Sequence, residues 1–454
     1  MDQLRIRAYN VLFGDAFLVT FPEVDKNGKN AIRNILIDFG NLPGGRVGGS
    51  DSVFEPIIKD IVKELNGQPL DLYVMTHEHM DHTQGLVYSE KKVYEADDTE
   101  LQGILKTRYA WLTASAADDY YQKFPKAEEI DLMFKKIHSM IGNLFNALKA
   151  NGEEVPEDVW VLWANNDSRS RDGCVNYIQS LAPDTTRYVY RGYDEENSHP
   201  FTEAKIEFWA PEQDTSTYYD MLHIMPMGLG VTEENKKTGQ QCTLTRVIPP
   251  PGVYSGAFYN LVKMRGCYLE NLLAIDKAKN NTSVVFCLEW RGIRLLFTGD
   301  AEKASWKMID KKVKLEPVHF LKVSHHASKT GLPDIDILNK FYPENKTDNV
   351  PRCALVSTFE GSQWKTIPDK DTLDEIRKRC DNFIEVHKQT KEGEHLDIIY
   401  DAPQQGELFV ASKNSEVYHK PSCYWATKIS PTNKILFATA QDAKNQGYRP
   451  CRCI

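Results

Sequence analysis

The stretch His77-Glu78-His79-Met80-Asp81-His82 holds four potential metal ligands within six residues. It follows the apolar segment Leu70–Thr76, which is typical of a buried strand. Imidazole nitrogens and carboxylate oxygens are ligands that divalent metals such as zinc take in proteins, and a catalytic site keeps a position open for water. Because contiguous side chains on a loop diverge, one such stretch can serve two ions. It predicts the first half of a metal centre.

Two further apolar strands end in residues of the same kind. Leu295–Gly299 runs into Asp300, and Leu321–Ser324 runs into His325 and His326. Core histidines would not recur at strand ends in this way, whereas a shared metal centre requires ligands from several segments. We therefore expect these segments, remote in sequence, to converge on one pair of cations.

Strands and helices alternate around these motifs. The order strand, helix, strand over the first eighty residues suggests a layered α/β architecture. The early elements are paired strands in Arg5–Phe21 and Asn34–Phe39 and a helix at Val53–Leu65. Later strands are expected at Ala204–Ala210, Thr282–Trp290, Ile293–Thr298, Val318–Ser324 and Ala354–Thr358, followed by a helix at Asp371–Arg379.

Two segments interrupt this pattern. Residues from about 95 to 165 turn polar and helical, with apolar residues at helix spacing between Ile130 and Leu148. They predict a helical insertion beside the site. The segment Asp214–Leu273 gives mixed signals around a loop at Pro249-Pro250-Pro251 and is left unassigned. Either segment could cover the pocket.

Length and composition suit one large catalytic domain with an appendage. The chain has 454 residues, a mean hydropathy of −0.48 and a formal net charge of −9. No run approaches the ~20 apolar residues that span a bilayer, and Met1–Arg7 lacks the features of a secretory signal. We therefore expect a cytoplasmic protein without a membrane partner. The negative charge argues against a protein that coats nucleic acid nonspecifically.

Charge and cysteines set the end of the chain apart. Ala411–Ile454 carries seven basic and two acidic residues, a balance of +5, which leaves −14 for the rest. His419 and Cys423 are four apart, and Cys451 and Cys453 form a second half-site, so a closed tetrahedral zinc site is expected. The alternative is a tail with incidental cysteines. The other six are expected to be buried singly: Cys174, Cys242, Cys267, Cys287, Cys353 and Cys380.

Together, these motifs resemble the metallo-β-lactamase superfamily, whose signature is His-x-His-x-Asp-His, and more closely the hydrolase domain of the ComEC family of DNA-uptake proteins. The resemblance covers most of residues 1–400 and implies an αββα sandwich with the metals between the edges of two sheets. Residues 1–404 would form this hydrolase domain. The matching motifs are Gly14-Asp15-Ala16, Ile37–Gly40, His77–Gly85, Asn280–Val285, Leu296–Glu302 and Leu321–Thr330.

The resemblance also implies a role for individual residues. Asp300 would bridge two divalent cations, and Asp38 would brace the histidine loop from behind. Further residues behind the ligands would be Asn280, Asn281 and Ser328. The remaining ligands would be His77 and His79 for one ion, Asp81 and His82 for the other, and His325, or alternatively His326, as the last.

One departure concerns the metal. Many superfamily members place a further histidine ligand where this sequence reads Asn280-Asn281-Thr282-Ser283, and the ComEC-like group looks similar there. With fewer imidazoles, zinc specificity weakens, so manganese is an alternative to zinc. His199 could substitute only if its loop folds inward.

The chemistry expected of such a centre is hydrolysis. Two close cations lower the pKa of a bridging water, which Asp81 or Asp300 could orient. The metals, with His82 among their ligands, would neutralise charge on an attacked phosphoryl group. Ser328 and Lys329 follow the paired histidines and suit phosphate contacts, although solvated loop residues are an equal reading.

Residues 405–454 resemble the Ada-type metal-binding module, which also occurs behind nucleases. The sequence departs from it by ending in Cys-x-Cys where Cys-x-x-Cys is usual. A structural zinc would supply the stability that so small a core lacks. The basic balance suits nucleic acid, as do the aromatic residues, which could equally form the core: Tyr418, Tyr424, Trp425, Phe437 and Tyr448.

Three functions remain open. The leading hypothesis is a free-standing ComEC-like phosphodiesterase or nuclease acting on DNA, with single strands favoured. The second keeps the fold but takes a small phosphodiester, a phosphocholine ester, a lactam or a thioester, because a charge of −14 repels polyanions. The third is a non-catalytic nucleic-acid-binding protein with a relict site.

Overall fold

The computed structural model describes most of the chain. The segment Asp214–Leu273, which the sequence left unassigned, lies largely outside the described residues. Cys242, Cys267 and Cys453 lie outside them as well. The described residues are 3–43, 49–96, 106–196, 198–218, 268–346, 348–359, 366–402, 409–420, 423–430, 433–437 and 440–452.

A seven-stranded sheet contains the strand that leads into the histidine stretch. Its order is β13-β1-β2-β3-β4-β5-β6, with β3 to β6 parallel and the other neighbouring pairs antiparallel. The strands are β1 (Gln3–Tyr9), β2 (Ala16–Val24), β3 (Asn30–Phe39), β4 (Leu72–Val74), β5 (Ala110–Thr113), β6 (Thr186–Val189) and β13 (His395–Asp401).

A six-stranded sheet contains the strands that lead into Asp300 and His326. Its order is β12-β11-β10-β9-β8-β7, with β9 to β12 parallel. The strands are β7 (Ala204–Ala210), β8 (Val285–Trp290), β9 (Ile293–Phe297), β10 (Phe320–Lys322), β11 (Cys353–Val356) and β12 (Asn382–Glu385). The expected strand at Ala204–Ala210 has these bounds in the structure.

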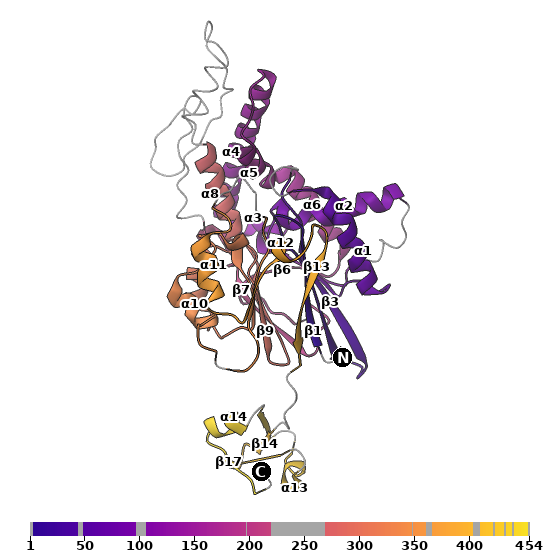
Figure 1. Cartoon of the computed structure of the whole chain (residues 1–454), viewed down its shortest axis with the longest axis vertical. Coiled ribbons are helices and arrows are strands. Elements are labelled where there is room, and N and C mark those ends of the chain that lie inside the picture. The colour runs from indigo at the N-terminus through magenta and orange to yellow at the C-terminus, as the bar shows by residue number, and fades with distance from the viewer. Residues whose placement is uncertain are drawn as a thin grey trace.

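The two sheets pack face to face, and helices cover both outer faces (Figure 1). Alternation in β4 divides its residues between two cores: Leu72 and Val74 pack between the sheets, and Tyr73 packs against the outer helices. On the first sheet these helices are α1 (Phe54–Leu65), α2 (Met80–Ala96) and α6 (Ser168–Leu181); on the second they are α9 (Lys303–Lys312), α10 (Ile335–Phe341) and α11 (Lys370–Arg377). The layers run helix, sheet, sheet, helix.

The helical insertion differs from its expected range. Residues Ala110–Thr113, inside that range, form β5 of the main sheet, so the insertion begins after Thr113. Four residues are too few for periodicity to distinguish a strand from a buried helical turn. The insertion comprises η3 (Ala114–Ala116), α3 (Tyr120–Lys123), α4 (Pro125–Ala150) and α5 (Glu157–Asn165), and it packs against α8 (Tyr268–Asn280).

A small unit follows β13. Its four strands have the order β16-β14-β15-β17 and enclose a core of Ala411, Tyr418, Phe437 and Ala443. Figure 1 shows it as a separate body beyond the sandwich. Its elements are β14 (Phe409–Ser412), β15 (Val417–His419), α13 (Tyr424–Thr427), β16 (Lys434–Phe437), α14 (Ala440–Asn445) and β17 (Arg449–Pro450).

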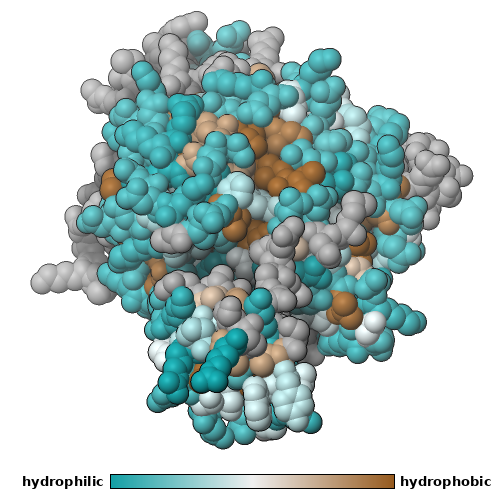
Figure 2. All heavy atoms as spheres, turned by 60° about the horizontal axis from the view of Figure 1, so that its bottom comes forward, coloured by the Kyte–Doolittle hydropathy of each residue, from teal (hydrophilic) through white to brown (hydrophobic). Residues whose placement is uncertain are grey.

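Short elements complete the described chain: η1 (Asp51–Val53), η4 (Thr215–Tyr218), η5 (Ser324–Ala327) and α12 (Val386–Gln389). Among the described helices, none combines the length and apolar character that a bilayer crossing requires. Figure 2 shows one face of the molecule, which is largely hydrophilic around an apolar patch. Of the scattered cysteines, Cys174, Cys287 and Cys353 are buried and Cys380 is half-buried.

Candidate metal centre

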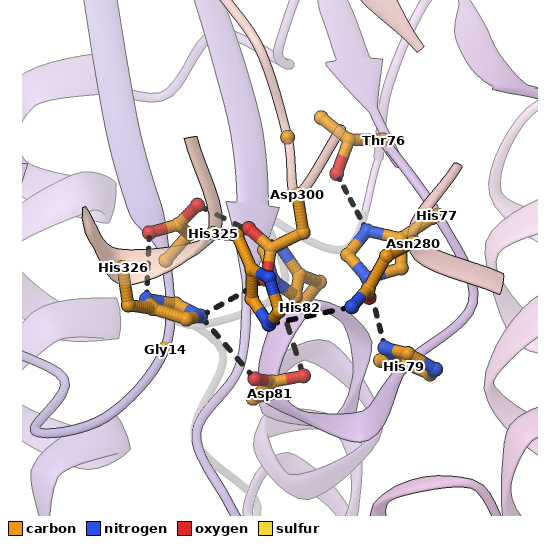
Figure 3. A network of polar contacts seen from close by, with 12 residues as sticks. Gly14, Thr76, His77, His79, Asp81, His82, Asn280, Asp300, His325 and His326 are labelled. Carbon is orange, nitrogen blue, oxygen red and sulfur yellow. Dashed lines mark hydrogen bonds and ion pairs between the residues drawn. The ribbon is translucent and has the colours of Figure 1, made fainter. Parts of the chain in front are cut away.

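Three strand ends meet between the two sheets. His77 follows β4, Asp300 follows β9 and His326 follows β10, each within a few residues of the strand end. The ligand atoms of Asp81, His82, Asp300 and His326 lie within 4.8 Å of one another, and all four residues are buried. Figure 3 shows these side chains pointing toward one another.

The distances in this group are those of ligands gathered around a common point. Asp300 Oδ2 lies 3.2 Å from His326 Nε2 and 3.5 Å from His82 Nε2. Asp81 Oδ2 lies 3.4 Å from the same His326 nitrogen. Nε2 of His82 and of His326 are buried without a hydrogen-bond partner among the described residues. Two buried nitrogens that face two carboxylates are a ligand set that fits a divalent cation.

His77 and His79 form the neighbouring half of the centre. His77 Nε2 and His79 Nδ1 approach within 3.0 Å, and the His77 ring lies 4.2 Å from that of His82. The other ring nitrogen of each is engaged behind, by Thr76 Oγ1 at 3.2 Å for His77 and by Asn166 Oδ1 at 2.9 Å for His79. The remaining ring nitrogens, His77 Nε2 and His79 Nδ1, therefore point toward the same position.

The two neighbouring histidines, His325 and His326, take different positions in the structure. His326 belongs to the group of four, while His325 Nε2 lies 3.3 Å from Asn280 Nδ2 and its Nδ1 lies 2.9 Å from Ser328 Oγ. The cause is the backbone: His325, His326 and Ala327 have φ of 49°, 50° and 62°. This left-handed turn tips the second histidine, not the first, toward Asp300.

The left-handed turn is held in place by its surroundings. His326 Nδ1 donates to the Ser357 carbonyl at 2.7 Å, and the Asp369 amide donates to the Ala327 carbonyl at 2.9 Å. Each non-glycine residue in this region costs on the order of 1–3 kcal/mol. Such strain persists only where packing fixes it, and it clusters at functional sites.

Two buried groups support the ligands from behind. Asp38 accepts from the Thr76 amide and hydroxyl, both at 2.7 Å, and faces His82 Nδ1 at 2.8 Å. Lys322, only 1% exposed, lies 2.5 Å from Asp15 and 3.1 Å from Asp300. Sequence reasoning placed Lys322 and Asp15 in motifs but gave them no role.

Electrostatics prepare the ligands for a cation. Burial opposes charge on Asp81 and Asp300, but the charges of His82 and His326 lower the pKa of Asp81 to about 2, and those of His326 and Lys322 hold the pKa of Asp300 well below its usual range. Burial alone would lower the pKa of His326, yet Asp300 and Asp81 raise it to about 10. Burial and the neighbouring histidines lower the pKa of His77. The carboxylates are thus ionised, which is the form that binds a metal.

The helical insertion contributes directly to the centre, which sequence reasoning missed. Asn165, at the end of α5, accepts from the Asp81 amide and donates to Asp81 Oδ1, both at 3.1 Å. Asn166 contacts His79 and donates to Asp276 of α8 at 2.9 Å. An Asn-Asn pair at a helix end carries no periodic or motif signal that would mark it.

The remaining predicted residues take separate positions. Asn280 donates to Asp276 and Glu302, both at 3.1 Å, and its Oδ1 is buried without a partner among the described residues. Asn281 accepts from the Ser305 amide, so it holds α9 and does not join the cluster. Lys329 is exposed. His199 stacks on Phe201 with ring centroids 4.7 Å apart and does not supply the further histidine.

Two glycines allow the first turn of α2, which carries Asp81 and His82, to approach the sheet. A Cβ on Gly14 would lie 2.2 Å from the Gly40 carbonyl oxygen and 2.6 Å from that of Asp81. A Cβ on Gly40 would lie 2.5 Å from the Met80 carbonyl oxygen. Both contacts are with backbone, so a larger residue would displace the ligands.

A second candidate metal site lies in the small unit. His419 Nδ1 and Cys423 Sγ are 3.5 Å apart, and Cys451 brings the three ligand atoms within 4.8 Å of one another. Burial lowers the pKa of His419, which favours the neutral imidazole that binds metal. Cys453, the fourth predicted ligand, lies outside the described residues.

The comparisons with known proteins bear mainly on this second site. Residues 399–454 match the family model described as "Metal binding domain of Ada". No curated protein matches the sequence. Among solved structures, the chain is similar to the crystal structure of a long form RNase Z from yeast, with 11% sequence identity and a TM-score of 0.33. That alignment covers 89% of this chain and 42% of the other, so the chain spans less than half the length of that protein.

The family match and the geometry agree at the end of the chain. The matched segment begins in β13 and includes every element of the small unit. A match to a metal-binding domain and a clustered His419, Cys423 and Cys451 together support a structural zinc in this unit.

Proposed function

We propose that the chain is a metal-dependent phosphodiesterase with a metallo-β-lactamase fold: a ComEC-like nuclease that acts on DNA, with single strands favoured. Residues 1–404 would be the hydrolase domain and 405–454 the zinc module. The observation that carries the proposal is the meeting of Asp81, His82, Asp300 and His326 from three remote segments at one buried point. The helix, sheet, sheet, helix layers agree with this fold.

Two divalent cations, zinc or manganese, would supply Lewis-acid chemistry at this point, ionising water and stabilising charge at a phosphoryl group. His77 and His79 would hold one cation, and Asp81, His82 and His326 the other. Asp300, which lies within 3.5 Å of both His82 and His326, would be shared between the cations. Lys322 and Asp38 would keep the ligands oriented.

A cleft beside His79 is lined by Lys135, His138 and Lys279. Both lysines pair with Asp131 at 3.0 Å, and Lys279 also lies 3.6 Å from Glu78, so carboxylates balance their charges within the protein. The cleft fits a small phosphodiester as well as a polynucleotide.

The zinc module supports nucleic acid as the substrate. Tyr418 and Phe437 are buried in its core, but Tyr424 and Trp425 are each 63% exposed. Lys428 lies 5.2 Å from the Tyr424 ring centroid. Exposed aromatic rings beside cations stack on unpaired bases. The alternative, a small phosphodiester or related ester, is favoured by the charge of −14 outside the module.

The test combines metal analysis with cleavage. The purified chain should contain bound metal and, with zinc or manganese, should cleave bis(p-nitrophenyl) phosphate and labelled single-stranded DNA, with duplex DNA and RNA as comparison substrates. His326→Ala and Asp81→Asn should abolish cleavage, whereas His199→Ala, a matched histidine outside the centre, should not. Cleavage that survives the first two substitutions would refute the site. Cleavage of the small ester but of no polynucleotide would favour the alternative.

A further inference from the structure

A cavity of about 260 Å³ lies apart from the metal centre, beside β6 at one side of the seven-stranded sheet. Its walls are rich in aromatic rings and include three charged residues: Lys123 and Asp119, which pair with each other at 2.7 Å, and Arg187. The residues used below are Tyr120, Phe124, Tyr188, Tyr190, Tyr193 and Arg187. The function proposed above uses none of them.

The aromatic walls are fixed in place. Tyr190 and Tyr193 pack edge to face with centroids 5.4 Å apart, and Tyr120 packs on Phe124 at 4.9 Å. The Tyr120 hydroxyl donates to the Gln213 carbonyl at 3.0 Å and accepts from the Thr215 amide at 2.8 Å. Rings held in this way lose little entropy when a planar ligand stacks on them.

Arg187 brings a cation whose partners are neutral. Its guanidinium donates to the carbonyls of Asp184 at 3.2 Å and Thr186 at 2.9 Å. Within the described part of the chain, no carboxylate lies within ion-pair distance of it. By contrast, Arg33 pairs with Glu23 at 2.6 Å. Arg187 therefore keeps its charge available for an anion.

The cavity lies at the same end of the parallel strands β4, β5 and β6 as the metal centre. β4, β5 and β6 are parallel, so Tyr190, directly after β6, emerges at the edge where His77 follows β4. β4 and β6 are two strand spacings apart in the sheet, about 10 Å. The Thr113 hydroxyl donates to the Thr282 carbonyl at 2.7 Å, which ties this edge to the segment after Asn280. A flexible single-stranded nucleic acid bound at the metal centre can thus reach the cavity.

We propose that this cavity binds one unpaired base of a single-stranded nucleic acid whose phosphodiester lies at the metal centre. The base stacks on Tyr190 and Tyr193, and a neighbouring phosphate pairs with Arg187. This inference rests on the proposed nuclease function. The cavity is too small for a helix and has aromatic walls suited to a planar ring. A duplex hides its bases in the stack, so the cavity selects single strands.

The experiment measures base stacking directly in the full chain, in an Asp300→Asn background that prevents cleavage. Oligothymidine carrying one 2-aminopurine is titrated, as DNA and as RNA, with fluorescence quenching reporting stacking and anisotropy reporting Kd. Tyr190→Ala should abolish quenching and raise Kd about tenfold, and Tyr190→Phe should restore both. Arg187→Ala should raise Kd and reduce its salt dependence. Arg377→Ala, an exposed arginine on α11, is the matched control.

The outcomes separate this inference from the proposed function. If Tyr190→Ala and Arg187→Ala bind like their parent while the unmodified chain cleaves DNA, the inference is wrong and the function stands. If Tyr424→Ala removes the quenching and Tyr190→Ala does not, the base stacks on the zinc module and the inference is also wrong. If the unmodified chain cleaves no diester, the proposed function fails whatever the binding shows.

Discussion

The two candidate metal sites differ in what holds them together. The candidate ligands of the first are Asp81, His82, Asp300 and His326, which are distant in sequence and are brought together by two packed sheets. Those of the second, His419, Cys423 and Cys451, are close in sequence and sit on a core of a few side chains. In the first, the fold positions the ligands; in the second, the metal must stabilise the fold. Metal removal should therefore unfold the small unit but leave the fold of the two sheets unchanged.

The largest expected effect is the loss of the zinc module. Cys423→Ser, or a strong chelator, should unfold residues 409–452, because structural zinc contributes on the order of 10 kcal/mol to so small a unit. Limited proteolysis should then cut in this region and leave the sandwich intact. Cys380→Ser, outside both sites, is the control. If the module resists proteolysis without zinc, its fold does not depend on the metal, and the proposed difference between the two sites is wrong.

The next effect concerns the metal of the sandwich. Asp300→Asn removes the shared carboxylate, so metal affinity should fall by more than about 100-fold, beyond the effect of an outer-shell change. Elemental analysis should then find about one zinc per chain, the one in the module. The far-ultraviolet circular dichroism should stay unchanged, since the sheets do not depend on the metal. Loss of the fold instead would show that both sites depend on metal.

A smaller effect is expected from the asparagines of the insertion. Asn166→Ala leaves His79 Nε2 without its 2.9 Å partner, so metal affinity should drop about 10- to 100-fold. Isothermal titration with manganese would measure it. Asn151→Ala, also in the insertion but exposed at the end of α4, should leave it unchanged. Equal affinities for both variants would mean that the insertion only covers the centre.

The smallest effect tests how tightly the loop is packed. Gly40→Ala places a Cβ 2.5 Å from the Met80 carbonyl oxygen, which should lower the free energy of unfolding by about 1–3 kcal/mol. Gly173→Ala, where nothing lies within 4 Å, should be neutral or slightly stabilising because it lies in a helix. Chemical denaturation of both variants measures the difference.

The main elements could be predicted because their signals are strong. β7 begins with alternating apolar and charged residues, and β9 is a mostly apolar run after a turn. The metal-ligand residue types that follow β4, β9 and β10 indicated that these strand ends meet. β5 could not be predicted because Ala110–Thr113 is short and lies between helical segments.

The finer parts of the centre depend on geometry that the local sequence does not encode. The choice between His325 and His326 rests on three left-handed residues, none of them glycine. Asn165 reaches Asp81 across 84 positions, and only the packing of α5 brings it there. The ligand roles themselves stay predictions until metal is measured.

The pairing of β1 with β13 has a consequence for synthesis. Gln3 pairs with Asp401 and Tyr9 with His395. During synthesis, β1 therefore lacks one of its two neighbouring strands until β13, almost 400 residues later, has been made. Until then its outer backbone groups are open to pairing with another chain. Contacts so distant in sequence also slow folding. A ribosome-bound chain stopped before His395 should therefore need chaperone protection, which a chain extended past Asp401 no longer requires.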